Sequence, residues 1–371
     1  MSPSEGPVKV AVLMGGICGE RDVSLSTGSC VAKNLLLAGH AVVPVCIHPD
    51  GNWERGPSLL DGATTEGPES WFSGRTSPAL SCSSQLIEEG AGCFFNALHG
   101  PGGEDGTIQG FLRFLGLPFT GPDVTPAALT MDKALTKSVL RDAGIRTPGG
   151  FEIPAMSGES PNRFLEILAN DQSVSVPFPW VVKPNCLGSS VGIMLIHSPE
   201  EFISEGLVNT ATWCPSPGLS GSGFIVEEKI EGRELTCGIL EPELGKALAL
   251  PPVEILPKSS EFFDYKAKYT LGEAEEICPA RISDELTAEV QSLAARVHEV
   301  FSCDPLSRTD IFLTDDEELV VLEINTLPGM TETSLIPQSA QEAGINLPEL
   351  FDQLVRHAIA REAMREAVDS L

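Results

Sequence analysis

The sequence has little positive charge. Its 371 residues include 24 lysines and arginines against 52 aspartates and glutamates, which gives a formal net charge of −28. Proteins bind the phosphate backbone of nucleic acids through clustered basic side chains, so this balance disfavours a duplex-binding surface. We therefore expect no nucleic-acid partner.

Long apolar runs are also missing. A membrane-spanning helix needs about 18 uninterrupted apolar residues, and no stretch approaches this length. The first residues do not show the pattern of a leader, which is a charged segment followed by an apolar one. The ten cysteines form no Cys-x-x-Cys pair and no Cys/His cluster with zinc spacing. Scattered cysteines suit a reducing compartment, so we expect a cytoplasmic protein with no membrane partner.

The length and the order of the patterns indicate an α/β protein with two or three domains. Val8–Met14 reads as a buried parallel-type strand, followed by a Gly-rich turn and an amphipathic helix that reaches about Ala38. Open sheets of this kind bind ligands at the carboxyl ends of their strands, where Glu20 would lie. The turn lacks the Gly-x-Gly-x-x-Gly spacing and so does not predict a dinucleotide site.

A second Gly-rich turn, from His99 to Gly106, follows a predicted strand at Cys93–Leu98. A tight structural turn would explain its glycines, but the presence of His99, Glu104 and Asp105 at a strand end favours a functional site. The Gly-, Pro- and Ser-rich stretch from Pro49 to Gly90 is predicted to be a surface elaboration.

The middle of the chain offers lysines for an anionic ligand. The pattern predicts a helix over Pro126–Leu140 that contains Lys133, and a strand at Trp180–Pro184 that contains Lys183. The Gly/Ser loop Asn185–Gly192 follows this strand. It is not a Walker A loop, but its backbone N–H groups could cover phosphates beside the lysine. A plain flexible loop explains it equally well.

Two further groups of residues suggest substrate contacts. Glu227 and Glu234, at the end of one predicted strand and the start of the next, could bind an adenine amino group and ribose hydroxyls, or could be solvated edge charges. Both tyrosines of the chain lie in Glu261–Tyr269 together with Lys266 and Lys268. This loop could close over an anionic substrate, or could be an aromatic-anchored structural loop.

Oxygen-bearing side chains interrupt two apolar patterns near the C-terminus. Arg308–Leu313 and Leu319–Asn325 are joined by an acidic turn and predict a β-hairpin. Glu323 and Asn325 share a face of their strand, and Asp310 on the partner strand can join them. Mg²⁺ usually takes one or two carboxylates and adds water and phosphate oxygens, so this set predicts a nucleotide-phosphate metal site. The alternative is an exposed hairpin that is merely acidic.

Together these stretches resemble the D-alanine:D-alanine ligases of the ATP-grasp superfamily over nearly the whole chain. Each motif alone is weak, but seven in this order and spacing are specific. The matching motifs are Gly15-Gly-x-x-x-Glu20-Arg-Asp-Val-Ser24, His99-Gly-x-Gly-Gly-Glu-Asp-Gly106, Met131-Asp-Lys133, Lys183-Pro with Gly188-Ser-Ser-Val-Gly192, Asp264-Tyr-x-x-Lys268-Tyr269, Arg308-x-Asp310 and Glu323-x-Asn325-Thr-x-Pro-Gly-Met330.

The resemblance implies a three-domain α/β ATP-grasp fold whose N-terminal domain has an open parallel sheet. The expected domains are 1–122, 123–227 and 228–371. ATP and two Mg²⁺ or Mn²⁺ ions are the implied cofactors. The family assigns Lys133, Lys183 and Lys268 to the phosphates, Glu227 and Glu234 to the adenosine, and Asp310, Glu323 and Asn325 to the metal ions.

The resemblance also assigns the amino-acid substrates. Glu20, with His99 nearby, would bind the ammonium of the first D-alanine, and Ser334 with the Leu335 backbone would bind the carboxylate of the second. The remaining roles concern the reacting atoms and the loop that covers them: Arg308 and the Gly329 N–H would neutralise a tetrahedral oxyanion, and Ser189 and Tyr269 would link to Glu20.

The implied reaction joins two D-alanines through an acyl phosphate to give D-alanyl-D-alanine for the peptidoglycan precursor, in a homodimer. Ligases that join D-alanine to D-serine or D-lactate are the alternatives among enzymes. Tyr269 argues against the D-lactate form, because the family associates Phe at this position with depsipeptide synthesis. A catalytically inactive nucleotide-binding regulator is the alternative of another class, and the intact Arg308 and Asp310 speak against it.

Overall fold

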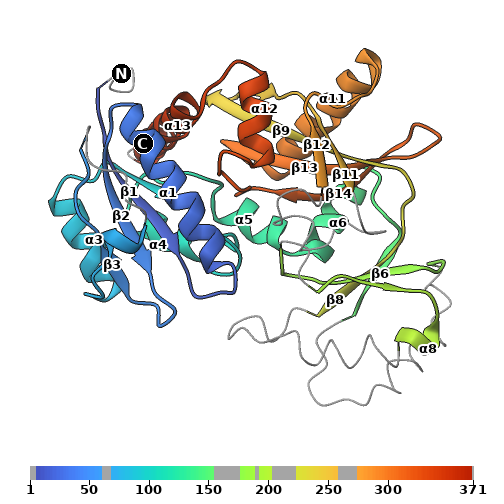
Figure 1. Cartoon of the computed structure of the whole chain (residues 1–371), viewed down its shortest axis with the longest axis horizontal. Coiled ribbons are helices and arrows are strands. Elements are labelled where there is room, and N and C mark those ends of the chain that lie inside the picture. The colour runs from blue at the N-terminus through green and yellow to red at the C-terminus, as the bar shows by residue number, and fades with distance from the viewer. Residues whose placement is uncertain are drawn as a thin grey trace.

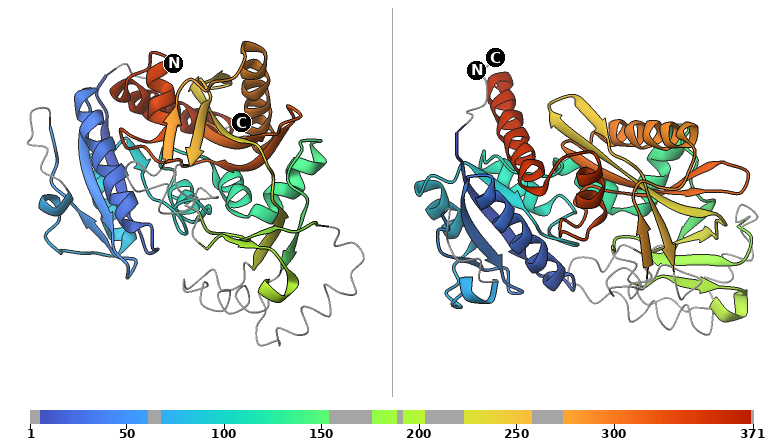
Figure 2. Two further views of the ribbon diagram at one scale, coloured as in Figure 1. Left: turned by 45° about the vertical axis from the view of Figure 1, so that its right-hand side comes forward. Right: turned by 45° about the horizontal axis from the view of Figure 1, so that its top comes forward.

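Three β-sheets organise the chain, which we describe from a computed structural model (Figure 1). The structure describes residues 6–60, 68–153, 176–188, 192–202, 223–257 and 274–369. Figures 1 and 2 show the N-terminal sheet on one side of the molecule, with the helices that follow it leading to the other two sheets. The three-sheet arrangement is mixed α/β, as the sequence predicts.

The N-terminal sheet has the strand order β3-β2-β1-β4. Strands β1 (Lys9–Gly15), β2 (Ala41–Ile47) and β4 (Cys93–Asn96) are parallel, and the short β3 (Trp53–Arg55) runs antiparallel to β2. Helix α1 (Arg21–Leu37) connects β1 to β2. The parallel strands are buried along almost their whole length, which requires helices on both faces of the sheet.

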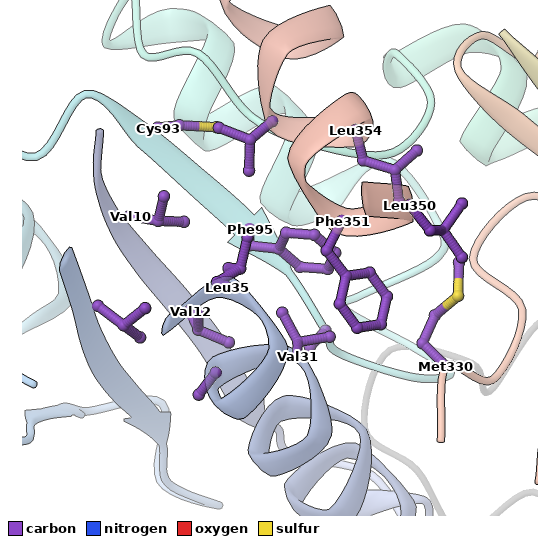
Figure 3. Close-up of a cluster of buried hydrophobic side chains, with 14 of the residues drawn as sticks. Val10, Val12, Val31, Leu35, Cys93, Phe95, Met330, Leu350, Phe351 and Leu354 are labelled. Carbon is purple, nitrogen blue, oxygen red and sulfur yellow. The ribbon is translucent and has the colours of Figure 1, made fainter. Parts of the chain in front are cut away.

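One face of this sheet is covered by α1 and by α13 (Leu347–Asp369), the last helix of the chain. Figure 3 shows Phe351 and Leu354 of α13 packed against Val12, Leu35 and Phe95. The rings of Phe95 and Phe351 meet edge to face, with centroids 5.7 Å apart. The two ends of the sequence therefore share one hydrophobic core.

The opposite face is covered by α3 (Ala79–Glu88) and α4 (Thr107–Phe114). The stretch from Pro49 to Gly90 thus contributes a strand, α2 (Pro68–Trp71) and α3, and its Trp53 and Leu86 are core residues. Our prediction of a surface elaboration is wrong for these elements. The many Gly, Pro and Ser residues of the stretch make the apolar pattern of α3 hard to recognise in the sequence.

The predicted helix over Pro126–Leu140 is in fact two helices, α5 (Val124–Met131) and α6 (Lys133–Asp142). Asp132 between them has extended backbone, and its carboxylate accepts a hydrogen bond from Leu135 N at 2.9 Å. This N-cap starts a new helix because a side-chain acceptor satisfies one of its free N–H groups. The break places Lys133 at the start of α6.

A small antiparallel sheet in the order β5-β8-β6-β7 occupies the middle of the chain. Its strands are β5 (Gly150–Ile153), β6 (Trp180–Pro184), β7 (Met194–Ile196) and β8 (Phe224–Glu228). The helical turn α8 (Pro199–Glu201) follows β7 and is capped by Ser198, whose Oγ accepts a hydrogen bond from Glu201 N at 3.2 Å. The core of this sheet is small and includes Trp180, Val182 and Val226.

The largest sheet has the order β12-β11-β9-β13-β14, with β10 paired to β9. Its strands are β9 (Arg233–Glu243), β10 (Lys246–Ala249), β11 (Val253–Pro257), β12 (Ala274–Ile277), β13 (Leu306–Leu313) and β14 (Leu319–Asn325). Helix α11 (Asp284–Phe301) packs its apolar face on this sheet, and α12 (Leu335–Glu342) follows β14.

Within the described ranges, no helix combines the length and the apolar character needed to cross a membrane. The three sheets correspond to separate stretches of sequence, but α13 returns to the first of them. The division into domains at 1–122, 123–227 and 228–371 stays a prediction.

Candidate active site

The predicted hairpin of β13 and β14 brings its polar residues together. Arg308 pairs with Asn325 and Asp310 pairs with Glu323 in the antiparallel register, which shifts just after Asp310. Paired residues of neighbouring strands lie on the same face of the sheet. The three candidate metal ligands are therefore adjacent, on a sheet whose other face is packed by α11.

Asp310 is buried and has three hydrogen-bonding neighbours. Arg308 donates to both carboxylate oxygens at 2.9 and 2.8 Å, and Asn325 Nδ2 donates at 3.1 Å. The hydroxyl of Thr236 on β9 donates at 2.6 Å. A buried carboxylate needs such donors and a counter-charge. Thr236 is not among the predicted site residues, because a threonine within a strand carries no local signal of this contact.

A buried group of charges lies where α6 meets the small sheet. Lys183 on β6 and Glu227 on β8 are diagonal neighbours in the register, and Lys183 Nζ lies 2.6 Å from Glu227 Oε2. Lys137 on α6 lies on the other side of this carboxylate, with Nζ 2.5 Å from Glu227 Oε1. Lys137 is not among the predicted site residues, although it stands one helical turn after Lys133.

The charges of this group change one another's pKa values. Burial lowers the pKa of Lys137 to about 8, although the charge of Glu227 opposes this effect. Burial would lower the pKa of Lys183 as well, but the charges of Glu227 and Glu323 raise it above its usual value. Burial would raise the pKa of Glu227, but the two ammonium groups lower it. Glu227 is therefore ionised between two cations.

Lys133 joins this group to the Gly/Ser loop and to the hairpin. Its Nζ donates to the carbonyl of Leu187 at 2.6 Å, and its backbone N–H donates to Asn185 O at 3.1 Å. Burial lowers the pKa of Lys133, and the charge of Glu323 on β14 opposes that shift. Because Glu323 also acts on Lys183, the lysines and the hairpin belong to one electrostatic site.

Glu234 adds a further carboxylate to this site. It lies on β9, in register with Ile255 and Phe312 of the two neighbouring strands. Its charge contributes to the raised pKa of Lys183. The two candidate adenosine-binding glutamates, Glu227 and Glu234, thus act on the same lysine from different sheets.

Glu20 lies at the end of β1, as the sequence predicts, immediately before α1. It is in contact with the second Gly-rich turn: a Cβ on Gly100 would lie 2.3 Å from Glu20 Oε2. Gly100 also has a positive φ of 64°, which favours glycine. His99 next to it is buried, with Nε2 2.9 Å from Thr27 Oγ1 and Nδ1 3.3 Å from Glu104 Oε1. The two turns therefore form one site.

Gly188 of the Gly/Ser loop faces the same carboxylate. A Cβ on Gly188 would lie 3.7 Å from Glu20 Oε1. The loop that begins beside Lys133 and Lys183 therefore ends its described part at Glu20. This contact connects the lysine group with the turns of the N-terminal sheet.

The residues predicted for the second substrate lie at the start of α12. Ser334 is its N-cap, and its Oγ accepts a hydrogen bond from Thr331 N at 3.1 Å. Gly329 is beside it, because a Cβ there would lie 3.0 Å from Ser334 Oγ. Leu335 is the first residue of the helix. A helix N-terminus offers free N–H groups and a positive dipole end to an anion.

Three predicted site residues, Ser189, Lys268 and Tyr269, lie outside the described residues, as does the whole loop Asp264–Tyr269. Among the residues that are described, no three His, Cys, Asp or Glu side chains form a metal-binding group. The candidate metal set instead combines two carboxylates with the amide of Asn325.

A mostly parallel N-terminal sheet, a small antiparallel sheet that carries Lys183 and an acidic hairpin fit the class of ATP-grasp enzymes that the sequence predicts. The family model of the D-Ala D-Ala ligase N-terminus matches residues 9–122, and that of the D-Ala D-Ala ligase C-terminus matches residues 157–356. The chain therefore belongs to the D-alanine–D-alanine ligase family, and the predicted family is confirmed.

Similar proteins agree over almost the full length. The D-alanine–D-alanine ligase of Desulfotalea psychrophila is 38% identical, covering 94% of each chain, and that of Gluconobacter oxydans is 36% identical, covering 95% of this chain and 100% of its own. The solved D-alanine–D-alanine ligase of Coxiella burnetii is 25% identical, with a TM-score of 0.75 over 98% of this chain and 97% of its own.

Two further solved structures bear on the ligands. The D-alanine–D-alanine ligase of Bacillus anthracis complexed with ATP is 28% identical, with a TM-score of 0.71 over 96% of this chain and 99% of its own. The VanG D-Ala:D-Ser ligase of Enterococcus faecalis is 29% identical, with a TM-score of 0.76 over 95% of this chain and 100% of its own. The predicted ATP-grasp fold is confirmed by these likenesses.

Proposed function

We propose that this protein joins two D-alanines to D-alanyl-D-alanine with ATP, releasing ADP and phosphate, for peptidoglycan precursor synthesis. The observation that carries the proposal is the placement of Lys133 and Lys183 beside the Gly/Ser loop and the buried Glu227 in a chain of this family. Phosphoryl transfer depends mainly on positioning and charge neutralisation, which such a site supplies.

The nucleotide would lie between the small sheet and the hairpin. Lys133 and Lys183 would bind its phosphates, together with Lys268 of the loop outside the described residues. Glu227 and Glu234 would accept hydrogen bonds from the adenine amino group and the ribose hydroxyls. The buried pair of Lys183 and Glu227 supports a site for a polyanion rather than a solvated surface.

Asp310, Glu323 and Asn325 fit Mg²⁺ or Mn²⁺, because they offer hard oxygen donors from adjacent positions of paired strands. When bound, two such ions would supply positive charge that neutralises the phosphates. Thr236 and Arg308 would orient the Asp310 carboxylate through the hydrogen bonds that they donate to it.

The first D-alanine would place its ammonium at Glu20, beside His99. Its carboxylate oxygen would attack the γ-phosphorus of ATP, giving an acyl phosphate and ADP. The second D-alanine would be held by its carboxylate at Ser334 and the Leu335 N–H, since a helix N-terminus favours an anion. Its amine would then attack the acyl carbon and displace phosphate.

Arg308 and the Gly329 N–H would stabilise the oxyanion between these steps, a role worth about 10²- to 10³-fold in rate per donor. The proximity of Gly329 to Ser334 supports a shared site for the oxyanion and the second substrate. Ser189 and Tyr269 would complete the site by linking to Glu20. The carboxyl group of the first D-alanine and the amine of the second would thus meet beside these residues.

A substrate panel tests the proposal. Purified protein with ATP and Mg²⁺ is given D-alanine alone, then D-alanine with D-serine or with D-lactate, and the ligated product is identified by its mass. We expect D-alanyl-D-alanine as the main product. D-alanyl-D-serine as the preferred product would favour a D-alanine:D-serine ligase. The similarity to the VanG D-Ala:D-Ser ligase supports this second candidate. No D-alanine-dependent ADP formation would favour an inactive nucleotide-binding regulator.

We also propose a cytoplasmic homodimer, in keeping with the family resemblance. Light scattering after size-exclusion chromatography tests the assembly. One chain has a mass of 39.4 kDa, and we expect twice this mass. A mass equal to a single chain at micromolar concentration would contradict it. Location in the cytoplasm is tested by fractionation of the cells that produce the protein.

A further inference from the structure

Glu227 is held from both sides by cations that differ in their access to solvent. The Lys137 and Glu227 side chains are each 2% exposed, whereas the Lys183 side chain is 11% exposed. Lys137 therefore lies behind the carboxylate, and Lys183 lies on its accessible side. A ligand entering the site would reach Lys183 before it could reach Lys137.

This arrangement creates a competition that the proposed reaction must resolve. In the structure the Lys183 ammonium lies 2.6 Å from Glu227 Oε2, yet its proposed role is to bind an ATP phosphate. A phosphate that draws Lys183 away would leave a buried carboxylate with less compensating charge. Loss of one partner from a buried ion pair is costly, because the remaining charge cannot be solvated.

We propose that Lys137 is a positioning residue of the nucleotide site. It remains with Glu227 when Lys183 turns to the phosphates, and it keeps the Glu227 carboxylate ionised and directed at the adenine amino group. This inference rests on the proposed function. Lys137 itself does not touch the substrate, since Glu227 stands between it and the accessible side of the site.

Lys137→Met tests this role, because methionine keeps the apolar stem and removes the charge. Without Lys137, Glu227 holds Lys183 more tightly and ATP binds less well. We expect the KM for ATP and the Kd for ATP–Mg²⁺ measured without D-alanine to rise about 10- to 100-fold, the range by which residues that orient metal ligands change affinity. The KM for D-alanine should stay within about twofold of the original value. Lys246→Met removes an exposed lysine, 68% accessible, and serves as the control.

The partner variant separates positioning from general stability. Glu227→Gln removes the charge that Lys137 is proposed to balance, so in this background Lys183 is released. We expect Lys137→Met combined with Glu227→Gln to bind ATP more tightly than Lys137→Met alone. If Lys137 has only a structural role, the variants should have lower melting temperatures, and the double variant should not regain ATP affinity. The Kd for ATP should then show no selective change.

Each outcome decides the proposal. A folded Lys137→Met protein whose Kd for ATP is within about twofold of the original value overturns it. If Lys137→Met does not fold, the double variant is compared with the single variant Glu227→Gln. An ATP affinity about tenfold lower in the double variant than in Glu227→Gln then overturns the proposal. Failure of the proposed function is distinguishable, because the unmodified protein would then bind ATP without forming any dipeptide.

Discussion

Thr236→Val removes one hydrogen bond from a candidate metal ligand and changes almost nothing else. Valine has nearly the shape of threonine, and Thr236 is fully buried on β9. Its hydroxyl donates to Asp310 Oδ1 at 2.6 Å. The substitution therefore leaves the packing in place and withdraws a single donor from the carboxylate.

The size of the effect follows from the surroundings of Asp310. A hydrogen bond to a charged group contributes about 1.5–3 kcal/mol. Asp310 keeps three donated hydrogen bonds, two from Arg308 and one from Asn325, so we expect the lower end, about 1.5 kcal/mol, in the free energy of unfolding. The carboxylate would also be less well oriented, and residues that orient a metal ligand commonly affect metal affinity by about 10- to 100-fold.

The assay measures urea unfolding and the Mg²⁺ dependence of dipeptide formation in the same protein. Thr236→Ser is the matched control, because it keeps the hydroxyl and should retain the Mg²⁺ dependence. An unchanged Mg²⁺ dependence in Thr236→Val, with the stability lowered as expected, would show that Asp310 is not oriented for metal by this contact. Equal loss in both variants would assign the effect to packing.

Three other perturbations have clear expected outcomes. Glu323→Gln should abolish turnover with Mg²⁺ while the protein stays folded, and near-normal turnover would contradict the metal assignment. Gly100→Ala should lower the rate of D-alanine-dependent ADP formation by about 10²-fold, because its Cβ would displace the Glu20 carboxylate, and an unchanged KM for D-alanine would argue against that role. Burial lowers the pKa of His298 and of His357. In the unfolded protein a histidine has a pKa of about 6.5. The stability that the neutral histidines provide is complete above this pKa and is lost as the pH falls through their lower pKa values in the folded protein. The urea midpoint should therefore decrease from pH 7.5 to pH 5. Substituting His298 by Gln should flatten this decrease.

Local patterns predicted the elements that contain their own signals. The buried run at β1 and the hairpin of β13 and β14 each appear where the sequence places them. Asp310 aligns with Glu323 through a register shift between Asp310 and Ile311, since an unbroken register from the turn would place Leu322 opposite Asp310. Such features depend on residues close together in the sequence.

The missed features depend on residues far apart. The contact of Phe351 with Phe95 brings the last helix onto the first sheet, and no local periodicity encodes that partner. Thr236 and Lys137 were missed for the same reason, since each acquires its role from a carboxylate more than seventy residues away. The break at Asp132 was missed because a helical apolar pattern continues through it.

The central claim is that the lysine group and the hairpin form one site for ligation of two D-alanines. Its most direct measurement is a count of products from the unmodified protein with D-alanine, ATP and Mg²⁺. We expect one ADP, one phosphate and one D-alanyl-D-alanine per cycle, identified by mass. ADP formed without D-alanine, or formed with it but without any ligated product, would contradict the claim.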